Sequence, residues 1–246
     1  MEVILLPLQE KEVIDKLYLA CRTCYSANTP CNMFKCLREE TYAGIDRRED
    51  KLKLLKHVIE SGHHSTLEHQ QLTFLISGVS RSLTHQLVRH RLCSISQASQ
   101  RYIEFKDGTF DYVIPSKIKN SAEALEVFEA AMNGISKAYS TLIDLGLPAE
   151  DARAVLPNAC ATNLTWSCNL RELMHVCNER LCTCAQQEIR QLVTEIKNAA
   201  VAQLPFMKPY LVPKCEMLGY CNENPKRSCG RKYTKDVVFG SLEVYS

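Results

Sequence analysis

The sequence predicts one helix-rich α+β domain. Several long stretches place apolar residues at helical spacing, a few short stretches alternate, and no internal repeat or linker-like segment interrupts the 246 residues. With 46% hydrophobic and 24% charged residues, the composition is that of an ordinary globular protein with a sizeable core. Nine glycines and nine prolines are too few for a collagen-like, low-complexity or turn-rich sandwich protein.

The first half of the chain supplies most of the predicted strands. Apolar residues keep helical spacing from Val13 to Cys21 and from Leu52 to Ile59, and Gly62 follows as a C-terminal stop. The expected elements are a strand at 2–8, a helix from 11, a loop with short helical pieces at 27–48, a helix to 59, a strand at 70–77, a helix at 80–91 and a second strand near 101–105.

The second half is predicted to be mostly helical. A long amphipathic helix spans 125–142 and ends before Gly146 and Pro148. A short helix at 150–156, a strand at 162–167 and one long helix, capped by Asn169 and running to Pro205, follow it. We place one domain at 1–212 and a Cys-rich tail of unknown role at 213–246.

The window between Glu68 and Glu104 contains no acidic residue. It holds three histidines and no lysine, and its charge is +4, whereas the whole chain carries +2. The four arginines that supply this charge are Arg81, Arg89, Arg91 and Arg101. A guanidinium binds phosphate through two donors at once, and the Ser and Gln residues at 94–100 add neutral donors and acceptors. The window therefore suits an anionic small molecule with a polar ring. A solvated basic face is the alternative, and RNA backbone binding is disfavoured by the near-neutral charge.

Four segments resemble, in the expected order, the signatures of the flavin-dependent thymidylate synthases. Arg89-His90-Arg91, then seven residues, then Ser99, resembles that family's RHR-x7-S signature. The other three segments are Gly62–His69 (GHHSTLEH), Arg153–Pro157 (R-x-x-LP) and Asn169–Arg190 (NxRxL…R). The resemblance covers residues 2–210. Gln97 stands where many members carry Glu, and Cys24 stands where many carry Ser.

The resemblance implies an α+β fold with a central mixed or antiparallel sheet, and an enzyme that reductively methylates dUMP to dTMP. Methylenetetrahydrofolate would supply the carbon, and FAD reduced by NADPH would supply the hydride. The implied partners are these small molecules and no nucleic acid or membrane, and the implied assembly is a homotetramer with sites shared between subunits. Two alternatives remain, a flavin- and folate-dependent uracil methyltransferase that acts on RNA and a non-catalytic nucleotide- or RNA-binding module.

The matching motif positions imply two sets of binding residues and no metal ligand. The dUMP set is Gln86, Leu87, Val88, Arg89, Gln97, Ala98, Ser99, Gln100, Arg101, Arg153 and Arg180. The FAD set is His63, Ser65, Arg89, His90, Arg91, Gln97, Asn169, Leu170, Arg171 and His175. Arg180 is the implied catalytic residue. Its permanent cation would stabilise negative charge at N3–O4 of the uracil ring, so that no Cys nucleophile is needed.

The spacing of two arginines gives an independent geometric expectation. Arg171 and Arg180 are nine residues apart, so on one straight helix they point roughly half a turn away from each other. They cannot then serve one compact site within one chain. We therefore expect an oligomer in which each chain contributes to more than one site.

Thirteen cysteines are an unusually large number for a chain of this length. The N-terminus lacks the features of a secretory signal, so we expect a cytoplasmic protein with mostly reduced thiols. Cys93, beside the arginines, is expected to pack and not to react. In the tail, Cys215, Cys221 and Cys229 could bind a metal with a fourth ligand, but a reduced or redox-sensitive appendage is the favoured interpretation.

Overall fold

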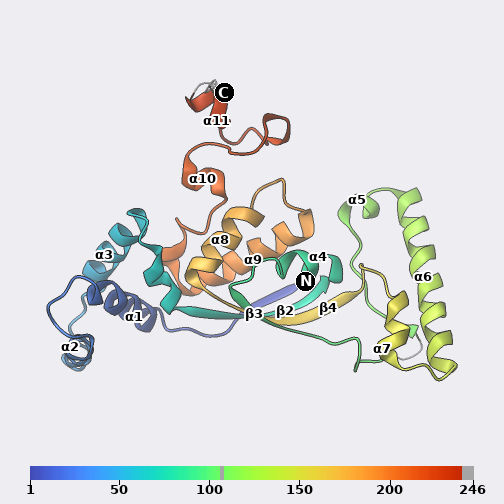
Figure 1. The fold of residues 1–246 in the computed structure, drawn as a ribbon, viewed down its shortest axis with the longest axis horizontal. Helices are drawn as coiled ribbons and strands as arrows, with labels where there is room; N and C mark the ends of the chain where they lie inside the picture. The colour runs from blue at the N-terminus through green and yellow to red at the C-terminus, as the bar shows by residue number, and fades with distance from the viewer. Residues whose placement is uncertain (106–107, 240–246) are drawn as a thin grey trace, which may run out of the picture. The chain divides into compact units, whose positions relative to one another are not determined.

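The chain folds around a four-stranded antiparallel sheet, as the computed structural model of residues 1–105 and 108–239 shows (Figure 1). The strand order is β1-β2-β4-β3. The strands are β1 (Glu2–Leu5), β2 (Gln71–Ser80), β3 (Cys93–Gln97) and β4 (Ala161–Asn169). With its many helices, the chain confirms the predicted α+β class.

Alternating burial explains why β2 and β4 form the centre of the sheet. In β2, Leu72, Phe74 and Ile76 are buried, and in β4 every second residue from Thr162 to Cys168 is buried. This period of two places the apolar side chains on one face of each strand. At the end of β2, Gly78 adopts a φ of 69°, and a Cβ there would lie 3.2 Å from the Met1 nitrogen. A side chain at this position would therefore be strained by the positive φ and by its close contact with Met1.

The chain divides into two compact units, residues 1–4 with 75–166, and residues 5–74 with 167–246. The first unit contains all four arginines of the acid-free window. Its helices are α4 (Arg81–Leu87), α5 (Ser116–Lys119), α6 (Ala122–Asp144) and α7 (Ala149–Ala152), with the 3-10 helix η3 (Arg153–Val155). Its core joins α6 to the segment around Phe110, where Phe105 packs edge-on against Tyr139 at 5.8 Å between ring centroids.

The second unit contains the N-terminal helices and the tail. Its helices are α1 (Glu10–Thr23), α2 (Pro30–Tyr42), α3 (Arg48–Glu60), η1 (His64–His69), α8 (Leu170–Arg180), α9 (Gln187–Gln203), η4 (Pro205–Met207), α10 (Lys214–Leu218), η5 (Pro225–Arg227) and α11 (Lys235–Phe239). Among the described residues, no helix is long and apolar enough to cross a membrane.

The segment predicted as a loop at 27–48 contains a regular helix, α2, so that expectation was wrong. Thr29 caps the helix by accepting the Asn32 N–H at 3.3 Å, and Pro30 occupies the first turn. Only Met33 and Leu37 of this helix are buried. The apolar stripe is too short to be recognised as periodic.

The predicted strand near 101–105 is also wrong, because the strand of this region is β3, at Cys93–Gln97. β3 lies at the edge of the sheet, and its Ser and Gln residues give no apolar alternation. The helix predicted at 80–91 stops at Leu87, so Arg89 and Arg91 lie outside it.

The single helix predicted from Asn169 to Pro205 is two helices. α8 ends at Arg180 and α9 begins at Gln187, and the turn between them contains Cys182, Thr183 and Cys184. Thr and Cys are weak helix formers, whereas the flanking segments are rich in Leu, Glu and Gln. The apolar residues on both sides keep a similar spacing, so the sequence pattern conceals the break.

Candidate active site

In the first unit, β2 leads directly into α4, and the Arg-His-Arg segment follows the end of that helix. Ser80 caps α4 by accepting the Leu83 N–H at 3.0 Å, and α4 then runs for seven residues. Of the predicted dUMP residues here, Gln86 is half-buried in the last turn and Leu87 is fully buried, so Leu87 offers only its backbone. Val88 and Arg89 are exposed.

The predicted FAD residues of this segment differ in exposure. His90 is buried, with 6% of its surface exposed, whereas Arg91 is exposed. Within residues 1–105 and 108–239, neither Arg89 nor Arg91 has an ion pair. Their charges are therefore available to an anion in solution.

The loop that follows β3 is held in place by hydrogen bonds to neighbouring elements of the same unit. Arg81 Nη2 donates to the carbonyl of Ala98 at 2.8 Å. The Gln97 amide nitrogen donates to the hydroxyls of Thr84 and Thr162, each at 3.3 Å. Burial lowers the pKa of Arg81 below its usual value, although a guanidinium remains charged at neutral pH. The backbone from Gln97 to Ser99 is thus fixed before any ligand binds.

Two predicted phosphate-binding arginines share one carboxylate residue. Arg101 binds the Glu150 carboxylate through Nε at 3.0 Å and Nη2 at 2.9 Å, and Arg153 Nε donates to the Glu150 carbonyl at 3.1 Å. Arg101 and Glu150 are both about half exposed, with side-chain exposures of 50% and 48%. Glu150 therefore contacts two arginines that lie far apart in the sequence, Arg101 through its carboxylate and Arg153 through its backbone carbonyl.

In the second unit, the turn from β4 into α8 meets the η1 segment. Asn169 caps α8 by accepting the Glu172 N–H at 2.8 Å, and the Leu170 N–H donates to the Gln70 carbonyl at 3.0 Å. Arg171 Nη1 forms an ion pair with Glu68 Oε1, and both side chains are about half exposed. These contacts bring the start of α8 beside η1, which carries the predicted FAD residue Ser65 next to His63.

One turn further along α8, His175 lies on the same face as Arg171. His175 acts on the buried carboxyl of Glu172, which is 5% exposed. Burial raises the pKa of Glu172, and the positive charge of His175 partly opposes this rise. The first turns of α8 therefore carry the exposed Arg171 guanidinium, the His175 imidazole and the buried Glu172 carboxyl group.

Arg180 is the last residue of α8, whereas Arg171 lies in its first turn. Over nine residues the helix rises about 14 Å and turns roughly two and a half times, so the two arginines leave opposite sides of it. Arg171 and Arg180 therefore lie on one helix and point away from each other, as their spacing in the sequence predicts.

The sequence analysis missed the side chains that hold the candidate residues. Glu68 lies within the GHHSTLEH segment but was given no role, and Glu150, Thr84 and Thr162 were not identified. These contacts join residues far apart in the chain, 103 positions for Arg171 and Glu68. No local pattern indicates such pairs.

The chemistry of the second unit's set fits a flavin dinucleotide. Its pyrophosphate would need cationic and backbone donors, and Arg171 could offer its guanidinium and its backbone N–H. Its ring and ribose need neutral donors and acceptors, which the exposed Ser65 and His63 provide.

Comparison with known proteins agrees with this arrangement. The family described as "Thymidylate synthase complementing protein" matches residues 9–206. The flavin-dependent thymidylate synthase of Nitratidesulfovibrio vulgaris is 42% identical over 229 residues, which cover 89% of this chain and 91% of that protein. The Geobacter sulfurreducens enzyme of the same name is 39% identical over 92% of this chain and 93% of its own length, so that match extends into residues 213–246. The Pyrococcus abyssi relative is 40% identical over 71% of this chain and 75% of that protein.

The family match and these relatives identify the chain as an enzyme of the flavin-dependent class. More particularly, the chain belongs to the family of flavin-dependent thymidylate synthases. The resemblance seen in its four motif segments is thereby confirmed.

Proposed function

We propose that the protein makes dTMP from dUMP, with methylenetetrahydrofolate as carbon donor and FAD reduced by NADPH as hydride source. One observation carries this proposal: the four motif segments fold into two polar sets. The first unit carries the arginines suited to a nucleotide monophosphate. The second carries the start of α8, suited to a dinucleotide, and Arg180 at the other end of that helix.

The dUMP phosphate is bound by arginines of the first unit. Arg89 is exposed and unpaired among the described residues, while Arg101 and Arg153 are already oriented by Glu150. Charge-assisted hydrogen bonds from guanidinium to phosphate are among the stronger polar contacts in proteins. The half-buried Gln86, Gln97, Ser99 and Gln100 add neutral donors and acceptors around the nucleoside.

Arg180 activates the pyrimidine electrostatically. As negative charge develops at N3–O4, a guanidinium that never deprotonates stabilises it, and C5 becomes nucleophilic. No Cys adduct is required. In keeping with this, the Cys93 Sγ donates to the His90 carbonyl at 2.8 Å, a contact that suits packing. Glu172 and His175 lie earlier on the same helix and do not take part in this step.

The proposed flavin-binding residues fall into two sets. Those of the second unit are His63, Ser65, Asn169, Leu170, Arg171 and His175, and those of the first unit are Arg89, His90, Arg91 and Gln97. When bound and reduced, the flavin supplies the hydride. Before it binds, Arg171 is oriented by Glu68, and Asn169 fixes the start of α8.

The active sites are shared between subunits of a homotetramer. This part of the proposal is supported by the opposite directions in which Arg171 and Arg180 leave α8. Light scattering with a parallel activity assay tests it. Full activity in a monomeric fraction would contradict it.

An absorbance spectrum of the purified protein is the first test of the proposed function. We expect a flavin spectrum that bleaches with NADPH and returns when dUMP and methylenetetrahydrofolate are added, with dTMP as product. A colourless protein whose RNA affinity falls steeply with salt would overturn the proposal. So would methylation of RNA uracil that excess free dUMP does not inhibit.

A further inference from the structure

Five of the thirteen cysteines lie in one small region of the second unit, at and beyond the end of α8. Two of them are in the turn between α8 and α9, and three are in the tail. They are Cys182, Cys184, Cys215, Cys221 and Cys229. All thirteen cysteines are free thiols in the structure.

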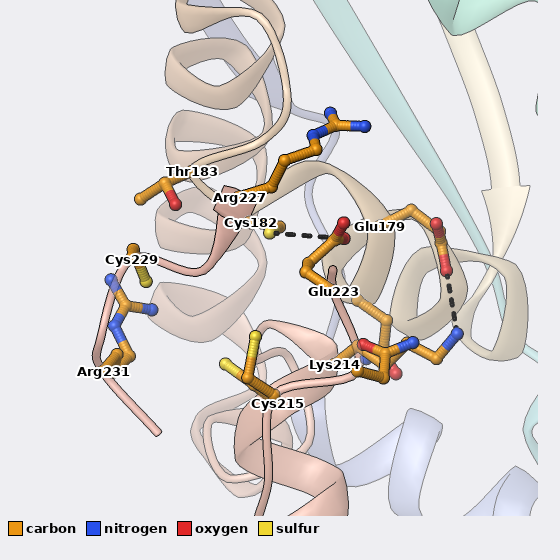
Figure 2. Close-up of a pocket in the computed structure, with 12 residues that line it drawn as sticks. Glu179, Cys182, Thr183, Lys214, Cys215, Glu223, Arg227, Cys229 and Arg231 are labelled. Atoms are coloured by element: carbon orange, nitrogen blue, oxygen red, sulfur yellow. Dashed lines mark hydrogen bonds and ion pairs between the residues drawn. The ribbon is translucent and has the colours of Figure 1, made fainter. Parts of the chain in front are cut away.

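Four of these thiols line one cavity of about 50 Å³ (Figure 2). Cys182 comes from the α8–α9 turn, and Cys215, Cys221 and Cys229 come from the tail. Figure 2 shows the labelled sulfurs of Cys182, Cys215 and Cys229 turned toward the same hollow. Pockets for organic ligands measure several hundred Å³, so this cavity has room for an ion and not for a metabolite.

The closest possible ligand atoms lie at the α8–α9 turn. Cys182, Cys184 and Glu223 each offer one atom within 4.8 Å of the others, and Cys182 Sγ lies 3.9 Å from Glu223 Oε1. The tail thiols Cys215, Cys221 and Cys229 line the same cavity as Cys182 and Glu223.

The tail has almost no hydrophobic core to hold it. Within 214–239, Cys221 is the sole buried residue. The helices α10 and α11 have five residues each. Nevertheless the backbone is ordered, because Cys221 forms a parallel β-bridge with Thr234. The Cys221 N–H donates to the Tyr233 carbonyl at 2.7 Å, and the Lys235 N–H donates to the Cys221 carbonyl at 3.0 Å. Segments this small usually need a metal or a disulfide to stay folded.

The charges around the cavity favour a strongly anionic centre. Lys214, Arg227 and Arg231 line it, together with Glu179 and Glu223. A divalent cation alone would be repelled by three basic residues. Four thiolates around one divalent ion instead give a net charge of −2, which those residues stabilise.

We propose that Cys182, Cys215, Cys221 and Cys229 bind one zinc ion and so fasten the tail to the α8–α9 turn. Zinc is the divalent ion that tetrahedral thiolate sites select, and binding releases the four thiol protons to solvent. Cys184 is left out of the ligand set, because it does not line the cavity and its Sγ donates to the Arg227 carbonyl at 3.3 Å. The tail sulfurs close around the ion as it binds.

The start of the tail, next to the proposed zinc site, also contacts the last turn of α8. Asn178 Nδ2 donates to the Val212 carbonyl at 3.0 Å, and Lys214 lies 3.7 Å from Glu179. These contacts join the last turn of α8, which carries Arg180, to the start of the tail. A fixed tail therefore restrains the helix end from which Arg180 projects.

Metal analysis of the full-length protein, purified without chelator, tests the proposal. We expect about one zinc and no iron per chain, and a zinc content near zero in Cys215→Ser and Cys229→Ser. Cys184→Ser and the matched control Cys31→Ser, an exposed thiol of α2, should keep their zinc. Wild-type protein that stays zinc-free even after incubation with zinc chloride would overturn the proposal. So would stoichiometric iron, or a Cys184→Ser variant that loses zinc as completely as Cys215→Ser.

A second measurement on the wild-type protein avoids any folding defect of the variants. A mercurial that blocks thiols should release zinc, seen as colour with 4-(2-pyridylazo)resorcinol, and should speed proteolysis within 214–239 by roughly tenfold or more. Flavin content, measured in the same samples, reports separately on the proposed function. Unchanged cleavage of the tail after complete zinc release would contradict the anchoring role.

Discussion

Two turns of the chain have the same local construction, yet they present their functional residues differently. β2 leads into α4 in the first unit and β4 leads into α8 in the second, and in each case the last strand residue caps the helix. Ser80 accepts the Leu83 N–H, and Asn169 accepts the Glu172 N–H. α4 ends after seven residues, so its candidate arginines Arg89 and Arg91 follow the helix, whereas the eleven residues of α8 carry Arg171 and Arg180 at opposite ends.

The two turns also differ in how their arginines are paired. Arg171, after β4, is held by Glu68, while Arg89 and Arg91, after β2, have no ion pair within residues 1–105 and 108–239. An unpaired exposed cation attracts a dianion at full strength, but a paired one must first give up its carboxylate. The proposed function therefore predicts that Arg89 and Arg91 bind a phosphate more strongly than Arg171 does.

The largest expected effect is at the far end of α8. Arg180→Ala should lower kcat by about 100- to 1,000-fold, because it removes a charge that stabilises the reacting ring and nothing replaces it. Flavin content should stay near that of the wild-type protein. Single-turnover assays and the absorbance spectrum measure the two effects, and a colourless Arg180→Ala protein would contradict the assigned role.

A direct comparison of the two turns comes next. Arg89→Ala should weaken dUMP binding by roughly 10- to 100-fold, the effect of losing a charge-assisted hydrogen bond. Arg171→Ala should weaken flavin binding by less, because in the wild-type protein Glu68 competes for the same guanidinium. Calorimetric titration with each ligand measures both. Equal losses would show that pairing with Glu68 does not matter, and Glu68→Gln is the matched control.

Replacing either helix-capping residue should have a smaller effect, of similar size for the two helices, on the free energy of unfolding. Ser80→Ala and Asn169→Ala should each lower the free energy of unfolding by about 1 kcal/mol. Asn169→Ser should restore the stability of α8 without restoring flavin affinity, if the Asn169 amide also contacts the flavin. Urea unfolding followed by circular dichroism separates these outcomes. A cap-restored variant with full flavin affinity would limit Asn169 to capping.

The smallest expected effect concerns pH. Burial raises the pKa of Glu172, and the charge of His175 opposes this. The folded chain then holds that proton more strongly than the unfolded chain. The free energy of unfolding therefore falls as pH rises from the unfolded value, near 4.5, through the raised folded pKa.

Glu172→Gln should remove this fall in the free energy of unfolding. In His175→Ala, which lacks the opposing charge, the fall should be larger than in the wild-type protein. Urea unfolding between about pH 5 and about pH 8 measures it. A wild-type stability that rises across this window relative to Glu172→Gln would show that the pKa of Glu172 is lowered instead.

The elements that were predicted correctly have long apolar stripes or clear caps. The run from Val13 to Cys21 identified α1, and Asn169 marked the start of α8. α2 and β3 were missed because α2 buries only Met33 and Leu37, while β3 is a polar edge strand. Such elements are stabilised by tertiary contacts and caps, which a periodicity search does not detect.

The candidate site could likewise be predicted only in part. Motifs located the arginines, but not the carboxylates that orient them, because Glu150 and Glu68 lie 49 and 103 positions from their partners. The Cys-rich tail could be noticed from composition alone. Only the fold shows that Cys182 lines the same cavity as three tail thiols.

The carboxylate of Glu150 sets a condition on any anion that uses Arg101. In the ligand-free protein this side chain neutralises part of the local charge, and it keeps the guanidinium from drifting into solvent. An incoming phosphate must displace or share that anion, so the observed affinity is the difference between two electrostatic interactions. Uncharged nucleosides and monoanions would gain less from this exchange than a dianion, so the ion pair would favour doubly charged ligands.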